Sequence, residues 1–403
     1  MPDDLNENEF GARILELRSW RGLTIRTAAD LAGISFGYWA QIERGDKVVN
    51  NRQKLEAISY ALKVSPTELT RKPHGSVDPE TAAAQAGLTA LSDVLLGYRI
   101  GEVPDVVPRE WEEIVAESVR LHLELRPACK YAEEVELLPR LLQELLVLSA
   151  RGPHRHDALI HLIQAYDVAT SLSGRLGDAG LPIVAIERMH AAAAELGDPQ
   201  WVSAVDWVRA QTLSGTDRPR QYQLAVAVAD GAPRERPEIF GMAHLTAAMA
   251  AAAQGQADTA RMHLAESGEI AELIEPDVSP WPLSMLVYGR TNVGIWKVSI
   301  GVELGDGPKV AETARGLDVT PISVSRQVAF WTEMGRGLIP ERKTRRAGIE
   351  AFKRADGLAV QQLRNNLLAR EAVRDQLRHA QHDDADGRDI RYLAWRMGLA
   401  PTG

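Results

Sequence analysis

The segment from residue 35 to residue 45, SFGYWAQIERG, combines residue types that could carry out sequence-specific DNA recognition. That chemistry needs contacts to base edges from one helix and contacts to phosphates around it. Trp39 and Ile42 lie three residues apart, so both can point into a small core on one face of a helix. This spacing leaves four residues free to face outward: Phe36, Gly37, Tyr38 and Gln41. The segment is interpreted as the recognition helix of a helix-turn-helix.

The residues before this segment suit the turn that a recognition helix requires. Gly33 tolerates the positive φ that a chain needs where one helix ends and another begins at a steep angle. Ser35 can then cap the new helix with its hydroxyl group. The sequence therefore predicts that the helix begins directly after Ser35.

The neighbouring helices follow from apolar spacing. Phe10, Ile14 and Leu17 predict a first amphipathic helix that ends at Gly22, and Thr24 can cap a second helix. Residues 44–47 are expected to form a loop, and Asn50 or Asn51 can cap a fourth helix. Three apolar residues of that helix are expected to face inward: Leu55, Ile58 and Leu62. Residues 65–68, SPTE, are typical of a helix start and predict a short fifth helix that ends near Leu69.

The charge of the chain is distributed unevenly. The whole sequence has a net charge of -9, but residues 10–72 carry eleven Lys or Arg against six Asp or Glu. A basic head joined to an acidic body is an asymmetry that the overall balance conceals. The head alone is suited to phosphate.

Composition limits the class of protein. A chain of 403 residues is expected to hold two or more domains, and its single cysteine, Cys129, excludes an intramolecular disulfide framework. The acidic N-terminus does not resemble a signal peptide, and no run approaches the ~18 apolar residues of a membrane helix. We expect a cytoplasmic protein without a membrane partner.

Residues 71–79, RKPHGSVDP, form the clearest boundary in the chain. We expect a DNA-binding domain at residues 1–72, a linker at 73–79 and a helical domain at 80–403. In that last part, Ala- and Leu-rich stretches alternate with short Gly- or Pro-containing breaks, and no strand pattern is sustained. Roughly eight to nine helix pairs of an α-solenoid are expected. An irregular helical bundle is the alternative.

Two segments of the tail share a small-large-small spacing that suits closely packed repeat helices. Ala260, Leu264 and Ser267 follow the expected turn at Gly255, and an earlier segment repeats the spacing. The earlier set consists of Ala185, Met189 and Ala192. Residues 388–399, RDIRYLAWRMGL, predict a final amphipathic helix that caps the open end of the solenoid, with dimerisation as the alternative.

Three segments of the head resemble the Xre/Cro family of lambda-repressor-like DNA-binding domains: LRSWRGLTIRTAADLAGIS, FGYWAQIERG and KLEAISYALKVSPTEL. The resemblance implies a five-helix fold that binds double-stranded DNA. It implies ten DNA-binding residues: Thr24, Arg26, Ser35, Phe36, Gly37, Tyr38, Gln41, Arg44, Lys47 and Arg52.

The resemblance gives these residues distinct roles. Phe36, Gly37 and Gln41 would face the major groove, where glutamine can pair with adenine and phenylalanine can pack on a thymine methyl group. Tyr38 could reach a base or a phosphate, and the basic residues would hold phosphates. The family usually has a leucine at Ala28, so the large indole that stands at residue 39 is expected to fill that space. An ordinary solvated helix surface is the alternative interpretation.

The head and the long helical tail together resemble actinobacterial Xre-type regulators with tetratricopeptide-like C-terminal domains. The resemblance implies a homodimer and a peptide, small-molecule or protein effector. Polar and aromatic residues on otherwise packed helices are candidates for its binding site: Tyr288, Arg290, Asn292, Trp296, Arg364, Asn365 and Asn366. Hydrogen bonds between neighbouring repeats are the alternative role.

Residue patterns for catalysis are weak. The spacing of His154, His156 and His161 does not place all three imidazoles on one helical face, and Cys129 has no histidine near it in the sequence. We therefore expect no enzyme activity, no metal and no cofactor. The prediction is a DNA-binding transcriptional regulator, and the alternative is a protein-interaction scaffold with little or no specific DNA binding.

Overall fold

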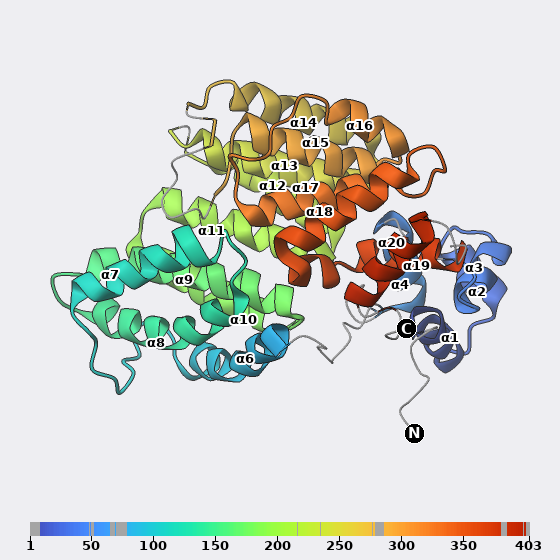
Figure 1. Ribbon diagram of the computed structural model, residues 1–403. Coiled ribbons are helices and arrows are strands. Elements are labelled where there is room, and N and C mark those ends of the chain that lie inside the picture. Colours follow the sequence, from blue (N-terminus) through green and yellow to red (C-terminus); the bar gives the residue numbers. More distant parts are fainter. Residues whose placement is uncertain are drawn as a thin grey trace.

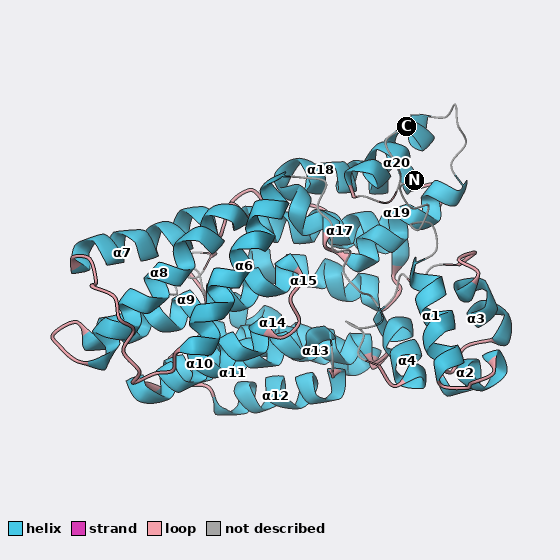
Figure 2. Cartoon of the chain, turned by 90° about the horizontal axis from the view of Figure 1, so that it is seen from below, coloured by secondary structure: helices cyan, strands magenta, loops and turns pink. Residues whose placement is uncertain are grey.

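The computed structural model describes most of the chain as a set of packed helices (Figure 1). Within the described ranges the structure has no strand, which confirms the all-α class (Figure 2). In the same ranges, no helix is both long enough and apolar enough to cross a membrane. The described residues are 9–47, 49, 52–64, 69, 79–215, 217–233, 235–275, 277–278, 286–379, 385–397 and 399.

Four helices form the described part of the head: α1 (Glu9–Trp20), α2 (Ile25–Leu31), α3 (Phe36–Glu43) and α4 (Arg52–Leu62). Gly22 and Gly33 have φ angles of +65° and +62°, which confirms both turns. The Thr24 hydroxyl accepts a hydrogen bond from the amide of Thr27, and the Ser35 hydroxyl accepts one from Tyr38, each at 3.1 Å. The caps of the second and third helices are thus confirmed. Asn50, Asn51 and the fifth helix predicted from residues 65–68 lie outside the described residues.

The head has its own apolar core. Trp39 and Ala28 are both fully buried in this core, in agreement with an indole that fills the space beside an alanine. The apolar residues predicted to face inward are also buried there: Phe10, Ile14, Leu17, Ile42, Leu55, Ile58 and Leu62. Ala29 and Ala32 of α2 are buried in the same core.

The body begins with α6 at Pro79, at the end of the predicted linker. Its first half consists of α6 (Pro79–Gly97), α7 (Trp111–Arg120), a π-helical turn η1 (Leu121–Leu125), α8 (Tyr131–Ala150), α9 (Arg155–Leu176), α10 (Leu181–Leu196) and α11 (Pro199–Thr212). The second half consists of α12 (Arg218–Gly231), α13 (Pro237–Ala253), α14 (Ala257–Ala271), α15 (Arg290–Glu303), α16 (Val310–Thr313), α17 (Val324–Leu338), α18 (Arg345–Arg364), α19 (Leu367–His379) and α20 (Ala385–Arg396).

Glycine-containing breaks separate these helices where the sequence predicts them. Gly177, Gly197 and Gly255 adopt φ angles of +106°, +73° and +75° directly after α9, α10 and near the end of α13. Helices that follow each other in the chain pack together, including α8 on α9, α9 on α10, α12 on α13, α13 on α14 and α17 on α18. Five of the six small-large-small residues are fully buried: Ala185, Met189, Ala192, Ala260 and Ser267.

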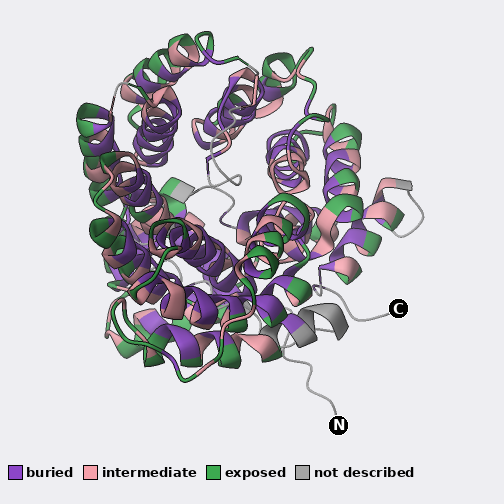
Figure 3. Cartoon of the chain, turned by 90° about the vertical axis from the view of Figure 1, so that its left-hand side faces the viewer, coloured by how far each residue is buried: buried purple, intermediate pink, exposed green. Residues whose placement is uncertain are grey.

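Helices near the end of the body contact segments near its beginning. The amide of Ser325, at the start of α17, donates to the carbonyl of Pro127 at 3.3 Å. At the end of α18, the Asn365 amide donates to the carbonyl of Arg175 at 2.7 Å. Seen from the side, buried residues lie where neighbouring helices meet and exposed residues lie on the outer rim (Figure 3).

The last two helices lie beside the head (Figures 1 and 2). Ile390, Leu393 and Ala394 form the buried face of α20, and Met397, directly after the helix, is buried with them. This face packs on α18 and α19, so the final helix contributes to the core at the end of the chain. Leu367, the first residue of α19, packs against the core of the head.

Candidate nucleic-acid interface

The recognition helix α3 presents a small exposed surface at its N-terminal end. Phe36 keeps 50% of its surface exposed, and Gly37 and Gln41 are exposed beside it. Trp39 and Ile42 point the other way into the core. The three residues that the resemblance assigns to the major groove therefore lie on one free face of α3.

Cationic side chains lie beside the aromatic residues of this face. The guanidinium of Arg26 is 5.7 Å from the ring centre of Phe36, and the ammonium of Lys54 is 4.9 Å from that of Tyr38. Both contacts are within the range of cation–π attraction. Lys54 is a cation that the sequence analysis did not assign. Its contact with Tyr38 forms because α4 packs on α2 and α1 within the same core as α3.

The other residues predicted to contact DNA lie around α3. Arg44 and Lys47 are exposed in the loop after α3, and Arg44 forms an exposed ion pair with Asp46 at 2.7 Å. Thr24 and Ser35 are exposed, and their hydroxyl groups accept the hydrogen bonds that cap α2 and α3. Arg52 begins α4, but its side chain lies outside the described part of the chain.

A buried carboxylate holds α3 in place. Glu43, at the end of α3, is only 8% exposed and accepts hydrogen bonds from two partners. The Trp39 indole donates to it at 2.6 Å, and the Arg18 guanidinium binds both of its oxygens at 2.5 and 3.0 Å. Such charge-assisted, bidentate pairs fix geometry strongly. The network ties α3 to α1, and the sequence analysis did not identify it.

Helix α19 of the body lies along one edge of the recognition helix. Tyr38 is only partly exposed, and its pKa is raised by burial and then by the negative charge of Asp375. A narrow crevice between α19 and the head is lined by Phe10, Gly11, Ile42, Gly45, Lys47, Glu371, Arg374 and Arg378. The body thus covers the side of the recognition helix and leaves the face of Phe36 and Gln41 open.

A second contact attaches the head to the body through α4. The guanidinium of Arg218, whose side chain is almost fully buried, donates to the Glu56 carboxylate at 2.7 Å. Arg218 is also bonded to Gln221 at 2.6 Å within α12. Two separate elements of the body, α12 and α19, therefore hold the head.

Of the predicted effector residues, the structure places two in a cavity and the others elsewhere. Asn292 and Trp296 line a cavity of about 200 Å³ in the body. Tyr288 is fully buried instead, and its hydroxyl donates to the carbonyl of Ser267 at 2.6 Å. Arg290 lies outside the cavity and forms an ion pair with Glu275 at 3.0 Å.

The remaining three candidates make hydrogen bonds around the junction of α18 and α19. Arg364 donates to the carbonyl of Arg396 at 2.9 and 2.7 Å. Asn365 bonds the end of α9, and Asn366 accepts a hydrogen bond from the amide of Ala369 at 3.0 Å. The contacts of Arg364 and Asn365 correspond to the alternative role, which is to join neighbouring elements, whereas Asn366 bonds within the first turn of α19.

The histidine cluster makes aromatic and hydrogen-bond contacts. His154 stacks on Trp111 with ring centres 4.7 Å apart, and His161 is bonded to Ser118 at 2.8 Å. Among the described residues, no group of three or more His, Cys, Asp or Glu side chains could hold a metal ion. Cys129 is buried, and burial raises the pKa of its thiol.

Comparison with known proteins identifies the head. Residues 9–71 match a family model described as a helix-turn-helix domain. The match contains all of α1 to α4 and ends before α6. The chain has no match among the curated proteins and none among the solved structures. A helix-turn-helix domain is thus present, and it stands at the N-terminal side of a body made of helices.

Proposed function

We propose that this protein is a sequence-specific DNA-binding transcriptional regulator of the Xre type. The observation that carries the proposal is the exposed face of α3, where Phe36, Gly37 and Gln41 lie together in a helix-turn-helix domain. An amide side chain and an apolar ring are suited to adenine and to the methyl group of thymine.

The charges around α3 support the same function. Arg26, Arg44, Lys47 and Lys54 are exposed in the elements that surround the recognition helix. Basic side chains in these positions attract phosphates and orient the domain on the duplex. Because the leading positions of α3 are small or apolar, each head reads few bases directly, and DNA shape contributes to its selectivity.

In this proposal the body is a tetratricopeptide-like sensor and dimerisation domain that acts in the cytoplasm. The packing of consecutive helices and the fully buried small residues Ala185 and Ala260 support a helical-repeat architecture. The cavity beside Asn292 and Trp296 offers a place for a peptide or small-molecule effector. A dimer with half-sites about one helical turn apart supplies the contacts that a single head lacks.

A salt titration tests the proposal against a protein-interaction scaffold. The full chain is mixed with genomic DNA fragments, the bound fragments are sequenced, and the affinity for the enriched fragment is measured from about 50 to 200 mM salt. A regulator enriches a discrete site and loses affinity by about a hundredfold or more over this range. A chain that enriches no site is a scaffold.

A further inference from the structure

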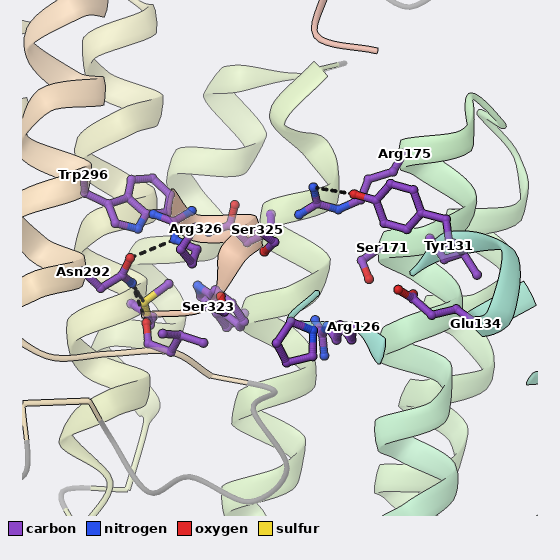
Figure 4. Close-up of a pocket in the computed structure, with 16 residues that line it drawn as sticks. Arg126, Tyr131, Glu134, Ser171, Arg175, Asn292, Trp296, Ser323, Ser325 and Arg326 are labelled. Atoms are coloured by element: carbon purple, nitrogen blue, oxygen red, sulfur yellow. Dashed lines mark hydrogen bonds between the residues drawn. The ribbon is translucent and has the colours of Figure 1, made fainter. Parts of the chain in front are cut away.

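The cavity of the body lies between elements that are far apart in the sequence. One wall carries Tyr131 and Glu134 from α8 with Ser171 and Arg175 from α9, and the other carries residues of α15 and α17 (Figure 4). Its volume of about 200 Å³ exceeds the roughly 150 Å³ of an engineered cavity that holds benzene. The cavity can therefore hold a small organic molecule.

Three arginines line this cavity, and among the described residues only Arg126 forms an ion pair with an acid. Arg126 forms an ion pair with Asp167 at 2.5 Å. Within the described part of the chain, neither Arg175 nor Arg326 forms an ion pair with a carboxylate. Arg326 donates to the Asn292 amide oxygen at 2.9 Å, and Arg175 makes only a long contact of 3.5 Å with the Tyr131 hydroxyl (Figure 4).

The surroundings of Arg326 disfavour its charge, whereas those of Arg175, Tyr131 above all, raise its pKa. Burial and then the nearby positive charge of Arg175 lower the pKa of Arg326 to about 10, although Glu333 opposes this effect. A buried cation without a counter-ion raises the free energy of the folded state. An anion bound between Arg175 and Arg326 removes that penalty, and each guanidinium still has donors to offer.

The acid of the cavity, Glu134, supplies only part of a negative charge. Burial raises the pKa of Glu134 to about 7, although Arg126 and Arg175 oppose this effect. At neutral pH the carboxyl group is therefore only partly ionised. Its Oε1 atom is buried without a hydrogen-bond partner within the described residues.

Apolar and aromatic residues also line the cavity, together with Gln211 and three serines. Trp207, Met242, Leu172 and Trp296 contribute to the walls. The Trp207 indole donates to Thr246 at 3.0 Å, whereas the buried indole N–H of Trp296 has no acceptor among the described residues. The site thus combines two cations that form no ion pair within the described residues, the indole N–H of Trp296 and an apolar wall, and Arg326 lies 5.6 Å from the ring centre of Trp296.

We propose that this cavity binds a small organic anion, with its carboxylate or phosphate group between Arg175 and Arg326 and its apolar part against the tryptophans. The assignment of this anion as the effector rests on the proposed function. The binding itself does not, because it is measured on the protein without DNA. Failure of the anion to bind and failure of the chain to select DNA are thus separate results.

Four small aromatic probes of similar size test the charge requirement by calorimetry on the full chain. Benzoate and phenyl phosphate carry the two anionic groups, benzyl alcohol is neutral, and benzylamine is a cation. We expect benzoate, phenyl phosphate or both to bind, each with one molecule per chain. The affinity is expected to fall as the salt concentration rises. The comparison of the two anions identifies the preferred group. If both anions bind no better than benzyl alcohol, the proposal is wrong.

Substitutions locate the site. Arg175→Gln and Arg326→Gln are each expected to weaken binding of the preferred anion by about tenfold or more. Arg209→Gln is the matched control, because Arg209 is exposed on α11, the helix that also carries Trp207. Thermal unfolding checks that each variant is folded, and Arg326→Lys, which keeps the charge, is expected to retain part of the affinity. Wild-type affinity in both glutamine variants would place the anion elsewhere and overturn the proposal.

Discussion

Glu43 shows how much one residue at the end of α3 contributes to the position of the recognition helix. Its carboxylate accepts from Trp39 of its own helix and from Arg18 of α1. All three side chains are mostly buried, so the network is shielded from water. The orientation of the exposed face of α3 depends on this carboxylate.

We predict that Glu43→Ala destabilises the head by about 2 to 4 kcal/mol, because it leaves the Arg18 guanidinium and the Trp39 N–H without their acceptor. Hydrogen exchange of the α3 amides in the full chain measures this local stability. The matched control is Glu16→Ala, which removes an exposed ion pair with Arg13 and is expected to change stability by less than about 1 kcal/mol. Equal exchange rates in the two variants would exclude a structural role for Glu43.

Glu134 makes the free energy of unfolding of the body depend on pH. Because its folded-state pKa is about 7, above the ordinary value of 4.5, the folded protein binds this proton more tightly than the unfolded chain. The free energy of unfolding therefore falls by about 3 kcal/mol as pH rises from 4.5 to 7, and this contribution is constant above that range.

A substitution isolates that contribution from those of other titrating groups. Glu134→Gln keeps the shape of the side chain and cannot ionise. We predict that urea unfolding finds the variant similar to the wild type at pH 5 and more stable at pH 8, by about 3 kcal/mol. A stability difference that is the same at both pH values would show that Glu134 titrates normally.

The residues that the sequence predicts correctly are those whose role is local. Gly33, Thr24 and Ser35 act within a few residues of their own position, so their types and spacing are sufficient to predict the turn and the two caps. Lys54 and Asp375 approach Tyr38 from other helices. No local pattern carries that information.

At the scale of the elements, local features are again predicted from the sequence and contacts between distant elements are not. Glycine and proline residues mark the ends of the helices, and the small residues at positions such as Ala185 and Ala260 predict close packing correctly. The return of α17 and α18 to the region of α8 and α9 depends on contacts between residues far apart in the sequence, which no local pattern predicts. The cavity arises from this return, which explains why only Asn292 and Trp296 of the predicted effector residues line it.

Helix α4 is the element through which α12 holds the head, and one ion pair is central to this contact. We predict that Glu56→Lys separates the head from α12, because it places a second cation against the buried Arg218, at a cost of about 3 kcal/mol or more. Small-angle X-ray scattering is expected to record a larger radius of gyration. Glu16→Lys makes the same change of charge on α1 at an exposed position and is expected to leave the radius unchanged. An unchanged radius in Glu56→Lys would mean that this ion pair does not hold the head.

At the scale of the whole molecule, the cavity and the recognition helix are connected by a short path. Arg175 lines the cavity, and its carbonyl accepts from Asn365 at the end of α18. Two residues later α19 begins, and Leu367 packs against the core of the head. An anion that moves Arg175 therefore has a direct route to the domain that contacts DNA.

We predict that the anion preferred by the cavity changes the affinity of the full chain for its DNA site by about fivefold or more. In Asn365→Ala this change is expected to decrease, while the affinity for the anion stays close to that of the wild type. Fluorescence anisotropy of labelled DNA, with and without the anion, measures the DNA affinity of the wild type and of Asn365→Ala. Gln223→Ala, an exposed position on α12, is the control. An equal response in Asn365→Ala would place the connection elsewhere.

The most direct test of DNA recognition by α3 is a selection of DNA sites by the full chain and by its Gln41→Ala variant. We predict that the wild type selects a discrete site. The variant is expected to bind that site more weakly by about 1 to 3 kcal/mol and to accept other bases at one position of each half-site. Gln223→Ala is expected to keep the wild-type selectivity. If Gln41→Ala selects the same site with the same preference at every position, α3 does not read the DNA as proposed.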